Sequence, residues 1–349
     1  MMTDLTRRQL WVAGASALAF TALPSGVMAA GPDVSFVHPQ LRPFALQMVK
    51  MAAVQPPLSR ATLAGRRAAM QAFARPAAAS PAFEKHFVKS RHQGYAVPLY
   101  AINAVAGASR PAIIHMHGGG FVAGEPVGLI SDMQKMAAEL DCLVVTVDYR
   151  LAPETTYVGS MEDNYGALKW VYDNAEKLGV DRNRIGVMGG SAGGGHAALL
   201  ALTARDRGEV PLAYQALIYP MLDDRTGSGI APPAPVGTLL WTADQNRFGW
   251  ESFLGQTPGT KDVPSIAVPA RYADLKGLPP TFIGVGSIDL FVDEDIDYAQ
   301  RLIAANVSTQ LVVVPGAFHG FDGVASETQV AKSFNATLID ALRQGLRGD

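Results

Sequence analysis

Residues 185–193 are Ile185-Gly186-Val187-Met188-Gly189-Gly190-Ser191-Ala192-Gly193, and the last five of them form a G-x-S-x-G pattern. This pattern joins an apolar run to an Ala/Leu-rich segment, which predicts a sharp turn from a strand into a helix. Gly189 and Gly193 suit that turn, because neighbouring backbone comes too close there for a Cβ atom. We therefore expect Ser191 to project from the strand end as a nucleophile, beside a helix N-terminus that favours negative charge.

Short apolar runs recur on both sides of this turn and alternate with longer helical patterns. Such alternation is typical of strands joined by crossover helices in a mainly parallel sheet. Several runs lack period-two alternation, as expected for strands that are covered on both faces. The predicted strands are residues 112–116, 142–147, 185–188, 214–219, 281–285 and 310–314. One crossover helix is predicted from apolar residues at helical spacing, which are Met161, Tyr165, Leu168 and Tyr172.

Two segments differ from this alternation. Residues 32–91 are rich in Ala, Met and Arg, have helix-like apolar spacing and show no strand pattern. A Pro/Gly-rich stretch at 227–237, followed by an aromatic segment at 241–253, interrupts the alternation between the fourth and fifth predicted strands. We interpret this second segment as an insertion whose aromatic side chains cover another part of the protein.

A glycine-rich segment, His117-Gly118-Gly119-Gly120-Phe121, follows the predicted strand 112–116 and so lies at the same sheet edge as Ser191. Consecutive glycines let backbone N–H groups face a cavity without interference from side chains. Ester cleavage places negative charge on the former carbonyl oxygen, and fixed N–H donors stabilise it. The predicted donors of this oxyanion hole are Gly119, Gly120 and Ala192, whereas His117 is interpreted as a hydrogen-bonded structural residue.

His319 is the predicted general base. It lies in a loop directly after the last predicted strand, and the carboxyl ends of strands are where open α/β sheets assemble their sites. With a nucleophile at this kind of turn, the acid is expected between the serine and the histidine along the chain. Asp289 meets that condition, since it follows the predicted strand 281–285 after a short loop. The predicted catalytic residues are therefore Ser191, Asp289 and His319.

No cofactor and no metal ion are expected. We interpret the acidic cluster of Asp293, Glu294, Asp295 and Asp297 as the first turn of a helix, where the helix dipole favours carboxylates. Histidines that would complete a transition-metal site are absent from its sequence neighbourhood. Cys142 is the only cysteine, and its apolar surroundings indicate a buried thiol rather than a nucleophile.

Taken in order, these segments resemble the bacterial branch of the hormone-sensitive lipase family, within the α/β-hydrolase superfamily. The likeness extends from residue 111 to residue 321. It includes the segments 117–120, 148–154, 162–163, 189–193, 275–280, 289–294 and 319–321. The resemblance implies an α/β-hydrolase fold, with a mostly parallel central sheet flanked by helices, and a carboxylesterase or lipase-like serine hydrolase. It also implies a helical cap formed by residues 32–91 and 227–263.

One position departs from the family pattern. An acidic residue or a threonine usually stands directly before the serine, whereas this chain has Gly190. The hydrogen bonds of such a side chain are therefore absent here. We expect this difference to affect the rate or the substrate preference and to leave the three catalytic residues unchanged.

The expected activity is hydrolysis of carboxylic esters with short to medium acyl chains, through an acyl-enzyme on Ser191. Two alternatives stay open. An amidase or formamidase could use the same triad, because the triad alone does not distinguish leaving groups. A non-catalytic ligand receptor on the same fold is the other, since some relatives have lost activity together with a triad residue.

Residues 1–30 are expected to be a cleaved signal peptide. Arg7 and Arg8 precede an uncharged, mainly apolar stretch at 11–23, and small residues follow at 27–30. The paired arginines resemble the twin-arginine export signal, which implies a periplasmic or secreted protein. The apolar stretch is shorter than the roughly 20 residues that span a bilayer, so no stable membrane span is expected in the mature chain.

Charge and composition restrict the partners. The formal net charge is -2, and no Lys/Arg cluster stands out along the chain, so nucleic acid is not an expected partner. The expected partner is a small-molecule ester. An exposed apolar cap or an edge strand could also support a homodimer.

Overall fold

Eight strands form one sheet in the part of the chain that the computed structural model describes, residues 32–72, 74–229 and 232–347. Their order across the sheet is β1-β2-β4-β3-β5-β6-β7-β8. β2 pairs antiparallel with both β1 and β4, and all other neighbours are parallel. The strands are β1 (Phe83–Lys89), β2 (Ala96–Ile102), β3 (Arg110–Met116), β4 (Leu143–Val147), β5 (Val180–Gly190), β6 (Tyr214–Ile218), β7 (Thr281–Gly286) and β8 (Thr309–Val314).

The six strands predicted from apolar runs are present as β3 to β8, although β5 begins earlier than predicted. The prediction that residues 32–91 contain no strand is wrong, because β1 lies within them, and β2 was also not predicted. Val88 is the one buried residue of β1, and the charged residues of this strand hide any apolar pattern. β1 forms through pairing at the sheet edge rather than through a local sequence signal, whereas β2 lies between β1 and β4 and is a mostly apolar run interrupted by Pro98. The segment predicted as the N-terminal part of the cap, residues 32–91, therefore includes one strand of the central sheet.

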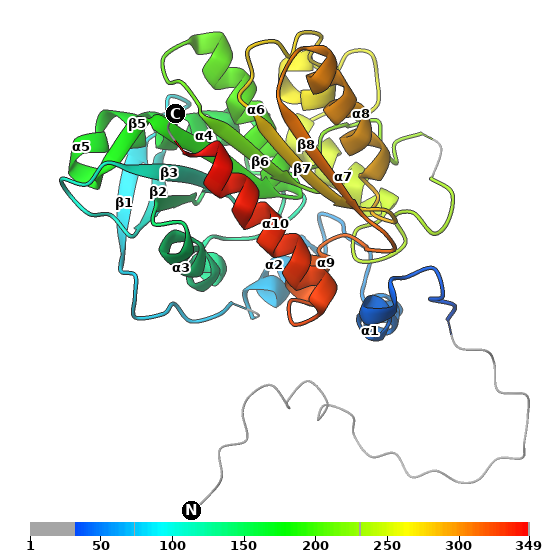
Figure 1. The fold of residues 1–349 in the computed structure, drawn as a ribbon. Helices are drawn as coiled ribbons and strands as arrows, with labels where there is room; N and C mark the ends of the chain where they lie inside the picture. Colours follow the sequence, from blue (N-terminus) through cyan, green and yellow to red (C-terminus); the bar gives the residue numbers. More distant parts are fainter. Residues whose placement is uncertain (1–31, 73, 230–231, 348–349) are drawn as a thin grey trace, which may run out of the picture. The chain divides into compact units, whose positions relative to one another are not determined.

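Helices cover both faces of the sheet (Figure 1). α4, α6 and α8 pack on one face against side chains such as Val145 and Leu217, while α1, α3 and α10 pack on the other against Ile113 and Ala216. Side chains alternate between the faces of a strand, which explains how one apolar run serves both layers. The α-helices are α1 (Arg42–Ala52), α2 (Leu63–Gln71), α3 (Ile130–Glu139), α4 (Tyr157–Asp173), α5 (Ala175–Leu178), α6 (Ala192–Arg207), α7 (Ala243–Leu254), α8 (Val292–Ala304), α9 (Phe321–Val324) and α10 (Gln329–Gly345). Short 3-10 helices are Pro39–Leu41, Val127–Leu129, Ser265–Ala267 and Pro269–Arg271.

The helix predicted between the second and third runs is α4. Its residues Tyr165 and Leu168 are buried in the core between α4 and the sheet, and Tyr172 packs against the same core while partly exposed. Met161, predicted on the same face, is buried instead in a separate cluster with Phe121 and Trp250.

Asp293, Glu294 and Asp295 of the acidic cluster lie in the first turn of α8, as predicted, whereas Asp297 lies beyond that turn. Cys142 is buried directly before β4, and burial raises the pKa of its thiol to about 12.

The aromatic segment 241–253 covers the glycine loop that follows β3. α7 begins after Thr242, whose backbone N–H donates to Oε1 of Gln245 in a capping box. Phe253 of α7 stacks on Phe121 with ring centroids 4.0 Å apart, and Trp250 meets the same ring edge-on at 5.0 Å. The insertion thus buries its apolar side chains against the loop beside Ser191.

α2 is tied to the same region by one arginine. Nε of Arg67 donates to the carbonyl of Val122 at 2.7 Å, and its two terminal nitrogens bind the carboxylate of Glu154 at 2.7 and 2.8 Å. Such a two-pronged pair fixes orientation as well as distance. α2 and α7 therefore both contact the glycine loop that follows β3.

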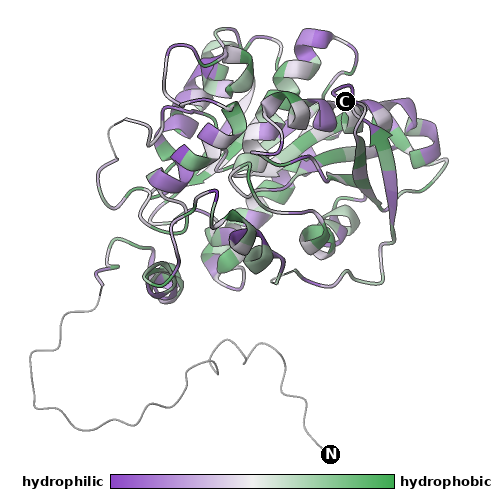
Figure 2. Ribbon diagram, turned by 180° about the vertical axis from the view of Figure 1, so that it is seen from behind, coloured by the Kyte–Doolittle hydropathy of each residue, from purple (hydrophilic) through white to green (hydrophobic). Residues whose placement is uncertain are grey.

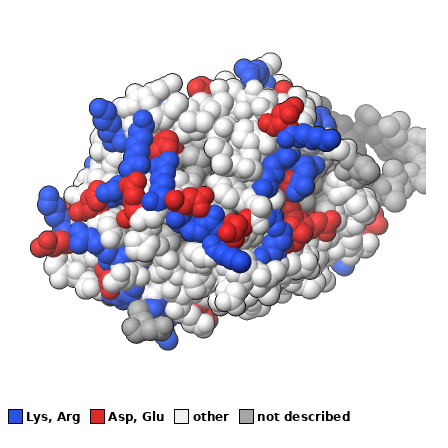
Figure 3. All heavy atoms as spheres, turned by 90° about the horizontal axis from the view of Figure 1, so that it is seen from above, with Lys and Arg blue, Asp and Glu red and all other residues white. Residues whose placement is uncertain are grey.

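The strands are mostly hydrophobic and the surrounding helices combine both kinds of residue, as Figure 2 shows. On the face seen in Figure 3, basic and acidic side chains lie next to one another rather than in patches of one sign. Among the described residues, no helix is both long and apolar enough to cross a membrane. Residues 1–31, which include the predicted export signal, lie outside the described residues.

Candidate active site

Ser191 lies at the turn between β5 and α6, in a backbone conformation that side chains rarely adopt. Its φ is 58° and its ψ is -127°, a strained combination for a residue other than glycine. A Cβ atom on Gly189 would lie 2.2 Å from the carbonyl oxygen of Gly193, and one on Gly193 would lie 2.1 Å from that of Met116. The turn is therefore possible only with glycine at these two positions, as the sequence predicted.

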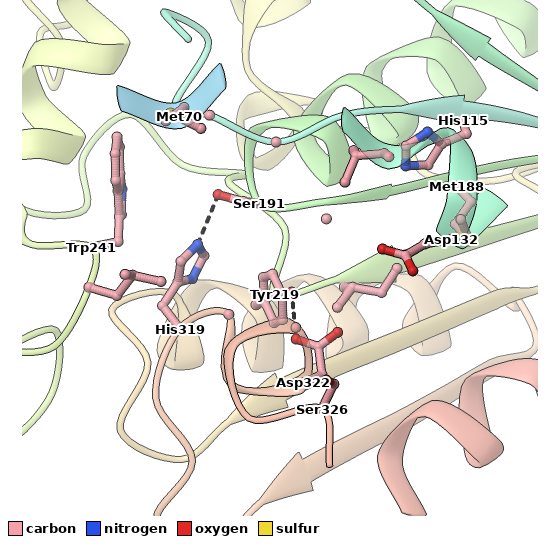
Figure 4. Close-up of a pocket in the computed structure, with 18 of the residues that line it drawn as sticks. Met70, His115, Asp132, Met188, Ser191, Tyr219, Trp241, His319, Asp322 and Ser326 are labelled. Atoms are coloured by element: carbon pink, nitrogen blue, oxygen red, sulfur yellow. Dashed lines mark hydrogen bonds between the residues drawn. The ribbon is translucent and has the colours of Figure 1, made fainter. Parts of the chain in front are cut away.

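The structure brings Ser191, His319 and Asp289 together, from the ends of β5, β8 and β7. Nε2 of His319 is 2.9 Å from Oγ of Ser191 (Figure 4), and its Nδ1 is 2.9 Å from Oδ2 of Asp289. All three side chains are buried. This chain of hydrogen bonds lets the imidazole accept the hydroxyl proton of Ser191 while Asp289 orients the ring.

Neighbouring groups fix the orientation of both partners of Ser191. The second carboxylate oxygen of Asp289, Oδ1, accepts a hydrogen bond from the backbone N–H of Phe291 at 3.0 Å. The imidazole of His319 contacts two aromatic rings edge-on, with centroid distances of 4.7 Å to Tyr219 and 5.2 Å to Phe291. Because the carboxylate and the ring are both held, little rearrangement is needed before reaction.

The glycine loop lies directly beside Ser191. A Cβ atom on Gly118 would be 3.3 Å from Cβ of Ser191, and Gly119 and Gly120 line the same cavity as Ser191. Gly119 has a φ of +126° and Gly120 a φ of +62°. Within the described residues, the backbone N–H groups of Gly119, Gly120 and Ala192 donate to no protein acceptor. All three predicted donors therefore remain free to bind an oxyanion.

Replacing Gly119 by alanine is expected to lower kcat/KM for a p-nitrophenyl ester by about 10²- to 10³-fold, the effect of losing one oxyanion donor. The added Cβ would lie 2.0 Å from the carbonyl oxygen of Ala123, and the positive φ strains any side chain, so the N–H must move. Steady-state kinetics measure this loss. Gly65→Ala, at an exposed helical glycine with open space around it, is the control. Activity within about threefold of wild type would contradict the assignment of Gly119.

His117 is a structural residue, as predicted. Its Nδ1 is 2.8 Å from the carbonyl oxygen of Gly118, and its ring stacks on Tyr149 with centroids 4.3 Å apart. The hydroxyl of Tyr149 donates to the carbonyl of His117 at 2.6 Å. Burial lowers the pKa of His117 to about 4, so its ring is neutral near pH 7. Tyr149 therefore braces the glycine loop, a role that sequence reasoning did not assign.

His196 lies in α6, one turn beyond Ser191, among aromatic rings. Its ring centroid is 4.4 Å from that of Tyr149 and 5.1 Å from that of Phe121. Neither ring nitrogen has a hydrogen-bond partner in the described part of the chain, and burial lowers the pKa to about 3. The folded protein thus holds a neutral imidazole that the unfolded chain would protonate in acid.

His196→Met is expected to weaken the loss of stability in acid. Between pH 6.5 and 4 the unfolded chain binds one more proton at His196 than the folded one. The free energy of unfolding therefore decreases by about 1.4 kcal/mol for each unit by which the pH is lowered. Urea unfolding at several pH values measures this slope. The variant should be less pH-sensitive by about that amount, and equal slopes for both proteins would contradict the buried neutral state.

The acidic turn of α8 has a structural role that the sequence did not reveal. Glu294 accepts hydrogen bonds from the backbone N–H groups of Leu222 and Asp223 at 2.7 and 3.2 Å. Asp295 is buried close to Asp289, and burial raises the pKa of both Glu294 and Asp295 well above their usual range. Among the described residues, no group of acidic, histidine or cysteine side chains has the arrangement of a metal site.

A cavity of about 770 Å³ opens at Ser191 and contains residues that the sequence analysis missed. Trp241 lies on one side of Ser191, where its ring touches the backbone of Gly120, and Tyr219 lies on another, with its hydroxyl 2.7 Å from Oδ1 of Asp322 (Figure 4). Tyr219 directly follows β6, and this position at the carboxyl end of a strand could have identified it as a site residue from the sequence. Asp322 gives no signal in the sequence that distinguishes it from a surface carboxylate.

Comparison with known proteins agrees with this geometry. A family model described as alpha/beta hydrolase fold matches residues 113–323. The chain is 35% identical to esterase LipI of Mycobacterium tuberculosis over 242 residues, which is 69% of this chain and 75% of that protein. It is also 35% identical to the carboxylesterase NlhH of the same species, over 68% of this chain and 74% of the relative. A solved structure titled bacterial heroin esterase has a TM-score of 0.82 and 34% identity, covering 90% of this chain and 99% of that one.

The matched region contains the Ser191 turn, the glycine loop and both partners of Ser191. The α/β-hydrolase fold expected from the sequence is therefore confirmed, as is the resemblance to the hormone-sensitive lipase family. The named relatives are esterases and carboxylesterases. The chain belongs to the hormone-sensitive-lipase-like branch of the α/β hydrolases and is a carboxylesterase-like hydrolase.

Proposed function

We propose that the protein hydrolyses carboxylic esters with short to medium acyl chains through an acyl-enzyme on Ser191. The observation that carries this proposal is the hydrogen-bonded chain from Ser191 through His319 to Asp289, with both bonds 2.9 Å long. Free backbone N–H groups on the glycine loop and on Ala192 complete the requirements for acyl transfer.

In the first half of the reaction, Oγ of Ser191 bonds to the ester carbonyl carbon while its proton moves to Nε2 of His319. The carbonyl oxygen gains the electron pair and binds the N–H groups of Gly119, Gly120 and Ala192. The intermediate then re-forms the carbonyl and breaks the bond to the alcohol oxygen. That oxygen takes the proton from Nε2 of His319, and the alcohol leaves.

In the second half, water replaces the alcohol. A water oxygen bonds to the acyl carbon as one of its protons moves to Nε2 of His319, and the same N–H groups bind the oxyanion. Breaking the bond to Oγ returns that proton to Ser191 and releases the carboxylic acid. Asp289 stabilises the imidazolium that forms in both halves.

The test compares an ester with the amide of the same acid, p-nitrophenyl butyrate and butyryl p-nitroanilide. We expect turnover of the ester with kcat/KM well above that for the anilide. An anilide rate equal to or above the ester rate would favour an amidase, the alternative that the triad geometry alone leaves open. No turnover of either compound would favour a ligand receptor on this fold.

A further inference from the structure

We propose that Gly190 opens an arm of the cavity, between α3 and α10, which binds the acyl chain of medium-length esters. The inference rests on the proposed function. It adds which side of Ser191 binds the acyl chain of the ester and which side binds the alcohol. In this arrangement Gly190 is a specificity-determining residue, because its missing side chain leaves the arm open at the nucleophile.

The backbone does not require glycine at position 190. Gly190 is absent from the residues with positive φ, unlike its counterparts Gly119 and Gly120 in the glycine loop. A Cβ atom at Gly190 would have its nearest neighbour, Cε2 of Tyr219, at 3.5 Å, which is an ordinary contact distance. Gly189 and Gly193 differ sharply, since a Cβ atom there would collide with backbone. The absence of a side chain at Gly190 therefore leaves an empty volume beside Ser191.

That volume continues along one face of the sheet. Gly190 lies two residues beyond Met188 on β5, so both face the same side, and they pair with Ile218 and Ala216 of β6. His115 of β3 pairs with Met188 and lies beside it. This is the face that α3 and α10 cover, and side chains of both helices line the same cavity as Ser191. The arm thus has the sheet as its floor and the two helices as its walls.

The arm is apolar over most of its lining. Its sheet and helix residues include Met133, Met136, Met188, Ile218, Leu338 and Ile339. The imidazole of His115 binds Oγ1 of Thr146 at 2.9 Å and is neutral, since burial lowers its pKa to about 3. Asp132, Lys135 and Glu139 of α3 also line the cavity. Asp132 is paired with Arg75 at 3.3 Å and with Lys135 at 3.1 Å, and Glu139 is paired with Arg343 at 3.7 Å. These walls suit an uncharged hydrocarbon chain.

The direction of proton transfer decides which part of the ester enters the arm. The leaving alcohol must take its proton from Nε2 of His319, so it lies on the imidazole side of Ser191. Trp241 stands on that side, whereas Met188 and His115 lie on the opposite side of Ser191 (Figure 4). The acyl chain therefore points away from Trp241, past Gly190 and into the arm.

Tyr219 forms the boundary at the entrance of the arm. Its hydroxyl donates to Asp322 at 2.7 Å, and its ring rests against His319. The same ring is the nearest neighbour of the space at Gly190. An acyl chain that enters the arm would pass between this ring and the glycine loop.

The test measures kcat/KM for p-nitrophenyl acetate and p-nitrophenyl octanoate in wild type and in two variants at Gly190. The octanoate-to-acetate ratio should fall slightly in Gly190→Ala and at least about tenfold in Gly190→Leu, because a bulky side chain occupies the arm. Asn335→Phe, which narrows the arm from α10, should lower the same ratio. Ala336→Phe is the control, since this neighbouring residue is exposed and outside the cavity lining.

The outcomes separate the two proposals. A lowered ratio in both Gly190→Leu and Asn335→Phe, with an unchanged ratio in Ala336→Phe, supports the acyl arm. An unchanged ratio in folded Gly190→Leu and Asn335→Phe, or a wild type that hydrolyses acetate but not octanoate, overturns it and leaves ester hydrolysis standing. Absence of turnover on both esters overturns the proposed function itself, and the acyl assignment with it.

Discussion

Replacing Ser191 by alanine is expected to lower kcat for p-nitrophenyl acetate by at least about 10⁴-fold. The variant keeps the oxyanion donors and the imidazole but cannot form the acyl-enzyme, and single removals of such a nucleophile have effects of this size. Stopped-flow or steady-state release of p-nitrophenolate measures the change. The pre-steady-state burst should disappear together with the steady rate.

Two controls make this result specific. Ser333→Ala changes an exposed serine on α10 and should keep the wild-type rate. Thermal unfolding should show that Ser191→Ala is folded, because its side chain bonds to His319 and not to the surrounding core. A folded Ser191→Ala protein with more than about one hundredth of wild-type activity would rule out Ser191 as the nucleophile.

Asp289→Asn is expected to lower kcat by about 10⁴-fold with little change in structure. An amide at this position can donate to Nδ1 of His319, which favours the tautomer that cannot accept the Ser191 proton. Its Oδ1 can still accept the N–H of Phe291, so the loop geometry is preserved. The loss should appear in kcat more than in KM, since Asp289 is buried behind the imidazole.

Asp293→Asn is the matched control for this change. Asp293 lies four residues away in the first turn of α8, and its side chain is exposed. The control should retain the wild-type kcat. If Asp289→Asn kept more than a tenth of the activity, the acid of the triad would have to be sought elsewhere.

The sequence was sufficient to predict the parts of the site that depend on local backbone demands. The turn at Ser191 and the loop at Gly119 need glycine for steric reasons, and those reasons hold in any fold that places a strand before them. His319 and Asp289 could be predicted because both follow apolar strands, whose carboxyl ends meet at one edge of a parallel sheet.

Features that depend on pairing between distant segments could not be predicted. β1 is an edge strand with mostly exposed residues, so only its hydrogen bonds to β2 make it a strand. The bond between Tyr219 and Asp322 joins residues far apart in the chain, and nothing local indicates it. The arm beside Gly190 also could not be predicted, because its walls come from α3 and α10 and its opening results from a missing side chain.

The proposed mechanism requires that Oγ of Ser191, activated by His319 and Asp289, forms a covalent intermediate. The most direct test is to treat the protein with a fluorophosphonate and to locate the adduct by mass spectrometry of its peptides. We expect one adduct per chain, on Ser191, absent from Ser191→Ala and formed far more slowly in Asp289→Asn. A folded protein that gains no adduct, or gains it on another residue, would show that Ser191 is not the nucleophile.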